Sequence, residues 1–145
     1  IQAMLDDAAM AVMVLNGGSA VPLWNTWLDG LQEEAPEGEE IDVAGLKAIF
    51  AKALEELEDM SGAKVGDKTM MDALIPASEA VAAYTGDSAD ELFDAAAQAA
   101  AQGAEATKQY VSKFGRAKSY GTKTIGTPDA GAVSMSWFFQ GLARE

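Results

Sequence analysis

The sequence predicts an all-α protein, an array of about six helices, and three observations support this class. Apolar residues recur every three or four positions in helix-length segments of the 145-residue chain. No stretch of useful length alternates apolar and polar residues as a half-buried strand does. Alanine, which has the highest helix propensity and lets helices pack closely, is abundant. The length suits one domain with a buried core, which we expect to cover residues 1–145.

The first three helices are marked by their ends. The first covers the start of the chain and stops at Gly17-Gly18, because glycine commonly follows a helix end. Pro22 suits the first turn of the second helix, where its missing N–H costs little. An acidic loop over residues 32–40 precedes a third helix, residues 43–60, for which Asp42 is a good N-cap.

Three more helices follow. The fourth spans residues 69–84 and contains Pro76, which we expect to kink it. Ser88 begins a capping-box pattern and opens an alanine-rich helix that we expect to extend to about residue 114. A segment rich in Gly, Thr and Lys precedes Asp129, which begins the last helix. Four aromatic residues at helical spacing are expected in the core rather than against a ligand: Trp24, Trp27, Trp137 and Phe138.

Composition excludes several classes of protein and of chemistry. The net charge of −13 disfavours nucleic-acid binding, because the phosphate backbone repels such a surface. No apolar run reaches the roughly 18–20 residues of a membrane span. The chain has no Cys and no His, so it has neither a thiol nucleophile nor an imidazole base. Its chemistry must use carboxylates, Lys, Arg, hydroxyls, backbone amides or a metal held by oxygens.

Positive charge is concentrated in one segment. Between positions 107 and 128 there is no acidic residue and there are five cations: Lys108, Lys113, Arg116, Lys118 and Lys123. In so acidic a chain this segment indicates anion binding. A solvated helix end, where Lys and Arg are favoured, explains it equally well.

Glycines gather between helices, at Gly17-Gly18, at residues 62–66 and at residues 115–131. Glycine allows close backbone approach to a ligand, and free amides at helix starts can bind anions. Taken one by one, these are ordinary turn and cap glycines. Taken together as parts of a functional site, the three loops are expected to meet at one end of the helix array.

The amino-acid sequences of these loops resemble those of a known family. Gly66-Asp-Lys-Thr-Met70 and the following Met71-Asp-Ala-Leu-Ile-Pro-Ala77 resemble a motif of the nucleotide-binding L subunit, or L domain, of dihydroxyacetone (glycerone) kinases. Residues 115–132 align without gaps with the family run G-R-A-S-Y-x-G-x-R-S-x-G-x-x-D-P-G-A. Gly17-Gly18 and the later Pro22-Leu23 are similar to its G-G-A-S-G-P-L. The motifs occur in the family's order and cover essentially the whole chain.

The resemblance implies an antiparallel up-and-down barrel or bundle of eight helices, of which this chain supplies about six. It implies a cytoplasmic kinase component that binds ADP or ATP at one rim and transfers phosphoryl groups to dihydroxyacetone or a related small sugar. A K subunit or domain would hold the dihydroxyacetone, and a phosphohistidine M-type protein would serve the phosphoenolpyruvate-dependent branch. Neither nucleic acid nor membrane is expected as a partner.

The same resemblance assigns nucleotide contacts to eight positions: Ser19, Ala20, Gly62, Met70, Arg116, Asp129, Ala130 and Gly131. Met70 would be an apolar wall for the purine, and Arg116 a planar cation for phosphate. No catalytic or metal-binding residue is assigned on this chain. Asp67 and Lys68 have two readings. Lys68 lies near phosphate, or else Asp67 caps the fourth helix while Lys68 pairs with it or with an acidic neighbour; N-cap chemistry favours the second.

Departures from the family suggest a second interpretation. The family's Asp-rich loop, which holds Mg²⁺, does not occur here, so we expect the metal ligands and first helices to precede this chain. The chain alone should then be inactive, and its uncovered apolar faces favour a homo-oligomer. Ala20 and Val21 replace a Ser-Gly pair, and Val21 cannot comfortably adopt a positive φ. The alternative is a catalytically impaired relative that acts as a partner-binding or regulatory module.

Overall fold

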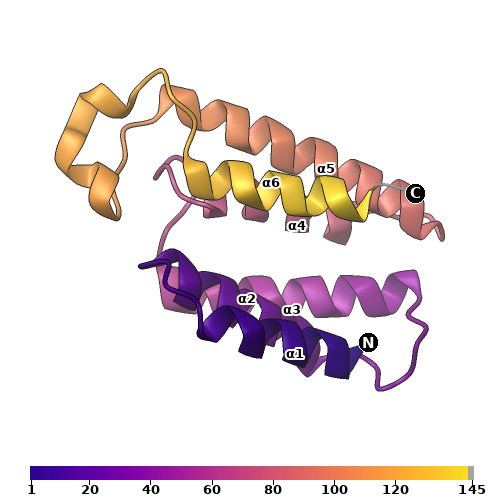
Figure 1. The fold of residues 1–145 in the computed structure, drawn as a ribbon. Helices are drawn as coiled ribbons and strands as arrows, with labels where there is room; N and C mark the ends of the chain where they lie inside the picture. Colours follow the sequence, from indigo (N-terminus) through magenta and orange to yellow (C-terminus); the bar gives the residue numbers. More distant parts are fainter. Residues whose placement is uncertain (144–145) are drawn as a thin grey trace. The chain divides into compact units, whose positions relative to one another are not determined.

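The computed structural model describes residues 1–143, which form six α-helices and two 3₁₀ segments (Figure 1). No strand occurs within these residues, so the predicted all-α class is confirmed. Two compact units divide the chain, Ile1–Gly62 and Ala63–Glu145. The expected single domain stays a prediction. None of the helices in the described part of the chain has the length and apolar character needed to cross a membrane.

The first unit contains α1 (Gln2–Met13), α2 (Ala20–Glu33) and α3 (Val43–Ser61), and α2 contacts both other helices (Figure 1). The core is made by apolar residues of α2 and α3: Trp27, Leu31, Phe50, Ala53 and Leu57. Asp42 caps α3 as predicted, because its Oδ1 accepts the Gly45 N–H at 2.7 Å. Gly62 ends α3 in the left-handed conformation, with φ of 63°.

The second unit contains α4 (Met71–Ala83), α5 (Ala89–Ala106) and α6 (Ala130–Leu142), which all contact one another (Figure 1). Its largest fully buried side chains come from all three helices: Met71, Leu74, Val81, Leu92, Met135 and Phe139. The predicted caps occur here too, since Ser88 Oγ accepts the Glu91 N–H at 3.3 Å and Asp129 Oδ2 accepts the Ala132 N–H at 2.9 Å.

Helices α4 and α5 meet backbone to backbone near Pro76. Proline has no N–H, so Pro76 cannot bond the Asp72 carbonyl four residues earlier in the helix. Gly103 of α5 lies against this carbonyl, and a Cβ at Gly103 would stand only 2.0 Å from Asp72 O. The absence of a side chain at residue 103 therefore fixes how closely the two helices approach.

Two expectations about the second half of the chain are wrong. Helix α5 ends at Ala106, not near residue 114, and a 3₁₀ turn, η1 (Thr107–Gln109), follows. The Thr107 hydroxyl donates to the Ala104 carbonyl at 2.5 Å, and the Thr107 carbonyl accepts a bond from Lys68 instead of continuing the helix. Trp137 is 66% exposed although the pattern placed it in the core, whereas Trp27 is fully buried as expected.

Candidate functional site

The turn before α4 is organised by Asp72. This carboxylate is 1% exposed and accepts the N–H groups of Gly66 at 2.6 Å and Thr69 at 2.7 Å. Asp72, not Asp67, therefore satisfies these two backbone N–H groups in the turn that leads into the helix. The Thr69-x-x-Asp72 spacing is a capping-box pattern, so the sequence contained the signal for this role.

Asp67 instead joins the turn to the segment that follows α5. Its Oδ1 lies 2.7 Å from the Lys113 Nζ, and its Oδ2 accepts the Lys64 N–H at 2.9 Å. The Lys113 N–H also donates to the Asp67 carbonyl at 3.2 Å. The Lys113 hydrogen bond and then the Lys64 amide hold the pKa of Asp67 below its usual value.

A pH-dependent stabilisation follows from this ion pair. Because the folded-state pKa of Asp67 is lowered, its contribution is fully present above the ordinary value of 3.8 and is lost as pH falls through the folded-state pKa. The Lys113 side chain is 61% exposed, so solvent screening keeps the expected loss in Asp67→Asn below about 1 kcal/mol at pH 7. Urea unfolding at pH 7 and at strongly acidic pH checks this, with the Asp67→Asn/Lys113→Ala double variant as control. Equal effects of Asp67→Asn at both pH values would contradict the assignment.

Lys68 is buried among backbone carbonyls. It is 4% exposed, and its Nζ donates to the oxygens of Thr107 at 2.7 Å, Thr124 at 2.7 Å and Thr127 at 2.5 Å. The favoured structural reading, in which Lys68 pairs with Asp67 or an acidic neighbour, is therefore wrong about the partner, because all three acceptors are backbone carbonyls. The sequence cannot predict which three carbonyls accept these bonds, because every residue carries a backbone carbonyl.

Residues 108–127, here called the basic loop, are drawn together at their two ends. Gly126 N–H donates to the Lys108 carbonyl at 2.7 Å, and Ser112 N–H donates to the Thr124 Oγ1 at 3.0 Å. Within the loop, the 3₁₀ segment η2 (Arg116–Thr124) is interrupted at Gly121, whose φ is 53°. A stretch read from the sequence as irregular thus has a defined path.

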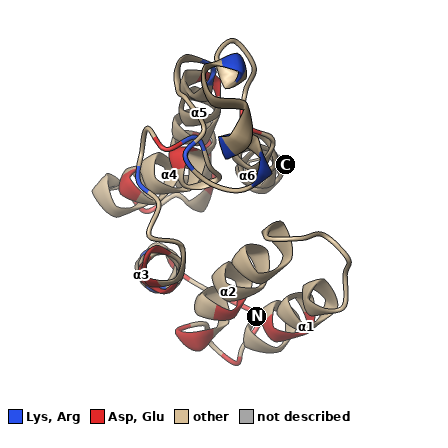
Figure 2. Cartoon of the chain, turned by 90° about the vertical axis from the view of Figure 1, so that its left-hand side faces the viewer, with Lys and Arg blue, Asp and Glu red and all other residues tan. Residues whose placement is uncertain are grey.

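The cations of the basic loop differ in their partners. Lys108 pairs with Glu105 at 2.6 Å and Lys113 pairs with Asp67. Arg116, Lys118 and Lys123 are exposed, and none of them forms an ion pair with another residue of the described chain, residues 1–143. In Figure 2 the blue positions of this unit lie along these loops. Three uncompensated cations on one loop favour the anion-binding reading over a merely solvated helix end.

The start of α6 lies against the start of α4. Asp129 caps α6, and its own N–H donates to the Thr107 Oγ1 at 2.8 Å. Burial raises the pKa of Asp129, and the Ala132 N–H partly opposes this. A Cβ at Gly131 would lie 3.3 Å from the Met70 Cβ, so only a small residue fits there without adjustment. Met70 is itself 4% exposed and offers little surface as a wall for a purine.

The eight predicted contact residues are therefore divided between the two units. Met70, Asp129, Ala130 and Gly131 lie together at the starts of α4 and α6, and Arg116 lies on the adjoining basic loop. Ser19, Ala20 and Gly62 belong to the first unit. Ser19 is the N-cap of α2 and Ala20 is its first residue, and Val21 is helical, so no positive φ is required at Val21. A meeting of the Gly17-Gly18 loop with the others stays a prediction.

Among residues 1–143 no group of three or more acidic residues lies close enough together to hold a metal ion. The acidic cluster that the resemblance assigns to Mg²⁺ is therefore not found among these residues.

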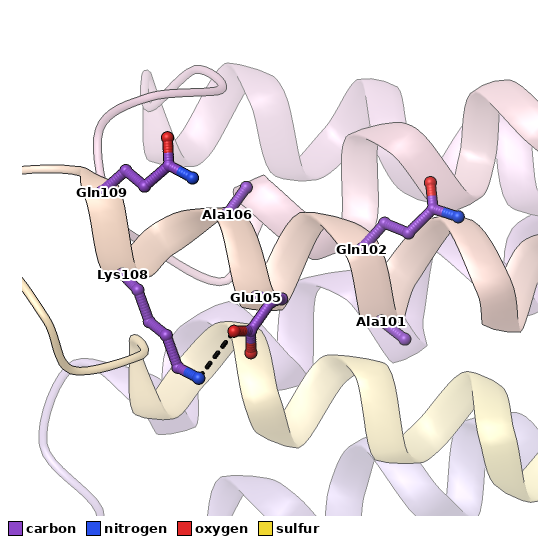
Figure 3. A pocket seen from close by; sticks show the side chains of 6 residues that line it. All are labelled: Ala101, Gln102, Glu105, Ala106, Lys108 and Gln109. Carbon is purple, nitrogen blue, oxygen red and sulfur yellow. Dashed lines mark hydrogen bonds and ion pairs between the residues drawn. The ribbon is translucent and has the colours of Figure 1, made fainter.

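One hollow of the second unit is separate from the predicted contacts. It has a volume of about 570 Å³ and lies along the end of α5, lined by Ala101, Gln102, Glu105, Ala106, Lys108 and Gln109. Figure 3 shows the Gln102 and Gln109 amides on one side of the helix and the Glu105–Lys108 pair on the other. No residue assigned to the nucleotide lines it.

Comparison with known proteins gives the family. The sequence matches the DAK2 domain over residues 1–144. It is 36% identical to an L-erythrulose kinase of Pectobacterium atrosepticum, over 97% of this chain and 24% of that protein. It is 30% identical to the ADP-binding subunit DhaL of the PEP-dependent dihydroxyacetone kinase 2 of Listeria innocua, over 100% of this chain and 67% of the relative. The corresponding Escherichia coli subunit is 26% identical, over 97% of this chain and 68% of the relative.

The coverage is uneven. The chain spans about a quarter of the length of the erythrulose kinases it matches and about two thirds of the DhaL subunits. The resemblance drawn from the three loop motifs is confirmed, and the relatives are kinases or kinase subunits. With its match extending from the first residue to residue 144, this chain belongs to the DAK2 domain family.

Proposed function

We propose that this chain is the nucleotide-binding component, for ADP or ATP, of a kinase that phosphorylates dihydroxyacetone or a related small sugar. The observation that carries the proposal is the joining of two family motifs: the turn before α4 and the loop before α6 are held together by Lys68, Asp67 and Thr107. The DhaL relatives are ADP-binding subunits, which supports the choice of nucleotide.

The chemistry assigned to this chain is binding and charge neutralisation. Arg116 is exposed and has no ion-pair partner within residues 1–143, so its planar guanidinium is available to phosphate oxygens. Lys118 and Lys123 raise the local positive potential in a chain whose net charge is −13. Phosphoryl transfer needs mainly such positioning and electrostatic stabilisation, with little covalent work by the protein.

The proposal extends to the assembly. A separate subunit or domain would hold the sugar, and a phosphohistidine protein would be needed if phosphoenolpyruvate is the donor. A cytoplasmic location supplies the nucleotide, and self-association through exposed apolar residues such as Met4, Met10 and Val14 is part of the same proposal. Residues 1–145 alone should not transfer phosphate. The regulatory alternative is less favoured, because the relatives are described as kinases and their subunits.

Calorimetry with ADP on the full-length protein tests the site. We expect Arg116→Ala to weaken ADP binding by about 10-fold or more, since hydrogen bonds to charged groups contribute about 1.5–3 kcal/mol. Lys118→Ala is the matched comparison: it removes one exposed charge of the same loop that contributes only to the general potential, so its effect should be smaller than that of Arg116→Ala. Absence of ADP binding in the unaltered protein, or equal effects of the two variants, would contradict the proposal.

A further inference from the structure

We propose that Lys68 is a positioning residue: its ammonium closes the basic loop at both ends and so holds this loop in the conformation that binds nucleotide. This inference rests on the proposed function. Lys68 does not touch the ligand in this account; it acts through the backbone of the loop that carries Arg116.

The ammonium of Lys68 uses all of its hydrogen-bond donors. A lysine ammonium has three N–H donors, and Lys68 directs one to each of three carbonyls. Thr107 lies directly before the basic loop, while Thr124 and Thr127 lie at its end. One side chain from a different part of the sequence therefore joins the entry and exit of the loop.

The chain also maintains an unfavourable backbone conformation at Lys68. Lys68 has φ of 61° and is the one non-glycine residue with positive φ within residues 1–143. Such a conformation persists only where the surroundings determine it, and it occurs preferentially at functional sites. A turn whose only task was to start α4 could use glycine here at no such cost.

The basic loop has other contacts besides those with Lys68. The bonds from Gly126 to Lys108 and from Ser112 to Thr124 are internal to the loop. From the turn before α4, Lys68 contributes three buried or half-buried bonds, whereas the Asp67–Lys113 pair is exposed at its lysine. Buried charge-assisted bonds are the stronger anchor, so the loop's path depends mainly on Lys68.

The test separates positioning from simple stabilisation. Lys68→Met keeps the side-chain length and removes the donors, while Leu92→Ala destabilises the same unit from its core, at a fully buried position of α5. Both are made in the full-length protein, and their ADP affinity and backbone hydrogen exchange are measured well below their unfolding temperatures. We expect Lys68→Met to weaken ADP binding by about 10-fold or more and to speed exchange in residues 108–127. Leu92→Ala should leave the ADP dissociation constant within about twofold.

A second measurement needs no variant at Lys68. If the closed loop favours ADP, linkage requires ADP to favour the closed loop. Saturating ADP should therefore slow acetylation of the Lys68 amine several-fold relative to Lys47 of α3. Unchanged acetylation of Lys68, or folded Lys68→Met that binds ADP like the unaltered protein, would overturn the inference and leave the proposed function standing. Failure of the unaltered protein to bind ADP would overturn the proposed function and this inference with it.

Discussion

Replacing Gly103 with alanine should lower the free energy of unfolding by about 1–2 kcal/mol. The added Cβ would lie 2.0 Å from the Asp72 carbonyl oxygen and 3.2 Å from the Ala73 Cα, which are backbone atoms inside α4. They cannot rotate away, so α4 and α5 must move apart, and overpacking of this kind costs about 1–3 kcal/mol or more. The gain in helix propensity from Gly to Ala, about 1 kcal/mol, offsets only part of this cost. Thermal unfolding followed by circular dichroism measures the change.

Gly141→Ala in α6 is the matched control for this prediction. A Cβ at Gly141 meets nothing within 4 Å, so the same substitution in another helix of the same unit should be neutral or slightly stabilising. Equal unfolding temperatures for the Gly103 and Gly141 variants would show that the close approach of α4 and α5 is not energetically significant.

Asp72→Ala should lower the free energy of unfolding by about 2–4 kcal/mol. The carboxylate is nearly inaccessible to solvent, and it accepts the Gly66 and Thr69 N–H groups. Removing it leaves both donors unpaired in the turn before α4, and each hydrogen bond to a charged group contributes about 1.5–3 kcal/mol. Part of this loss is offset, because the variant no longer buries a charged group. Denaturant unfolding gives the loss directly.

Asp67→Ala provides the comparison for Asp72→Ala. It removes a carboxylate from the same turn, but one whose partner Lys113 is largely exposed, so its loss should stay below about 1 kcal/mol. A loss in Asp72→Ala no larger than that in Asp67→Ala would contradict the role given to Asp72 at the start of α4.

The helix starts and the family could be predicted from the sequence because each depends on residues that are close together in the chain. Asp42, Ser88 and Asp129 each bond the N–H of the residue three positions later, an interaction contained in one turn of chain. The motifs around Gly66 and Gly115 likewise carry the family resemblance in consecutive residues, and the family match confirms it.

The errors arose where distant contacts override local preference. The helical pattern of the sequence predicts that α5 continues beyond Ala106, but the Thr107 carbonyl accepts a bond from Lys68, 39 positions away in the sequence. Trp137 follows the helical apolar pattern and is nevertheless exposed. Periodicity reports that a helix has an apolar stripe, not which part of the stripe a neighbour covers.

By itself the sequence determined the helical class, the caps of α3, α5 and α6, the excess of cations over residues 108–123 and the family, since each depends on neighbouring residues or on a contiguous motif. Only the tertiary structure decided that Asp72 rather than Asp67 organises the start of α4, and that Lys68 is bonded to the carbonyls of Thr107, Thr124 and Thr127. The physical reason is that a backbone carbonyl is the same acceptor in every residue. The sequence therefore does not indicate which three carbonyls a lysine side chain binds, and only the folded chain does.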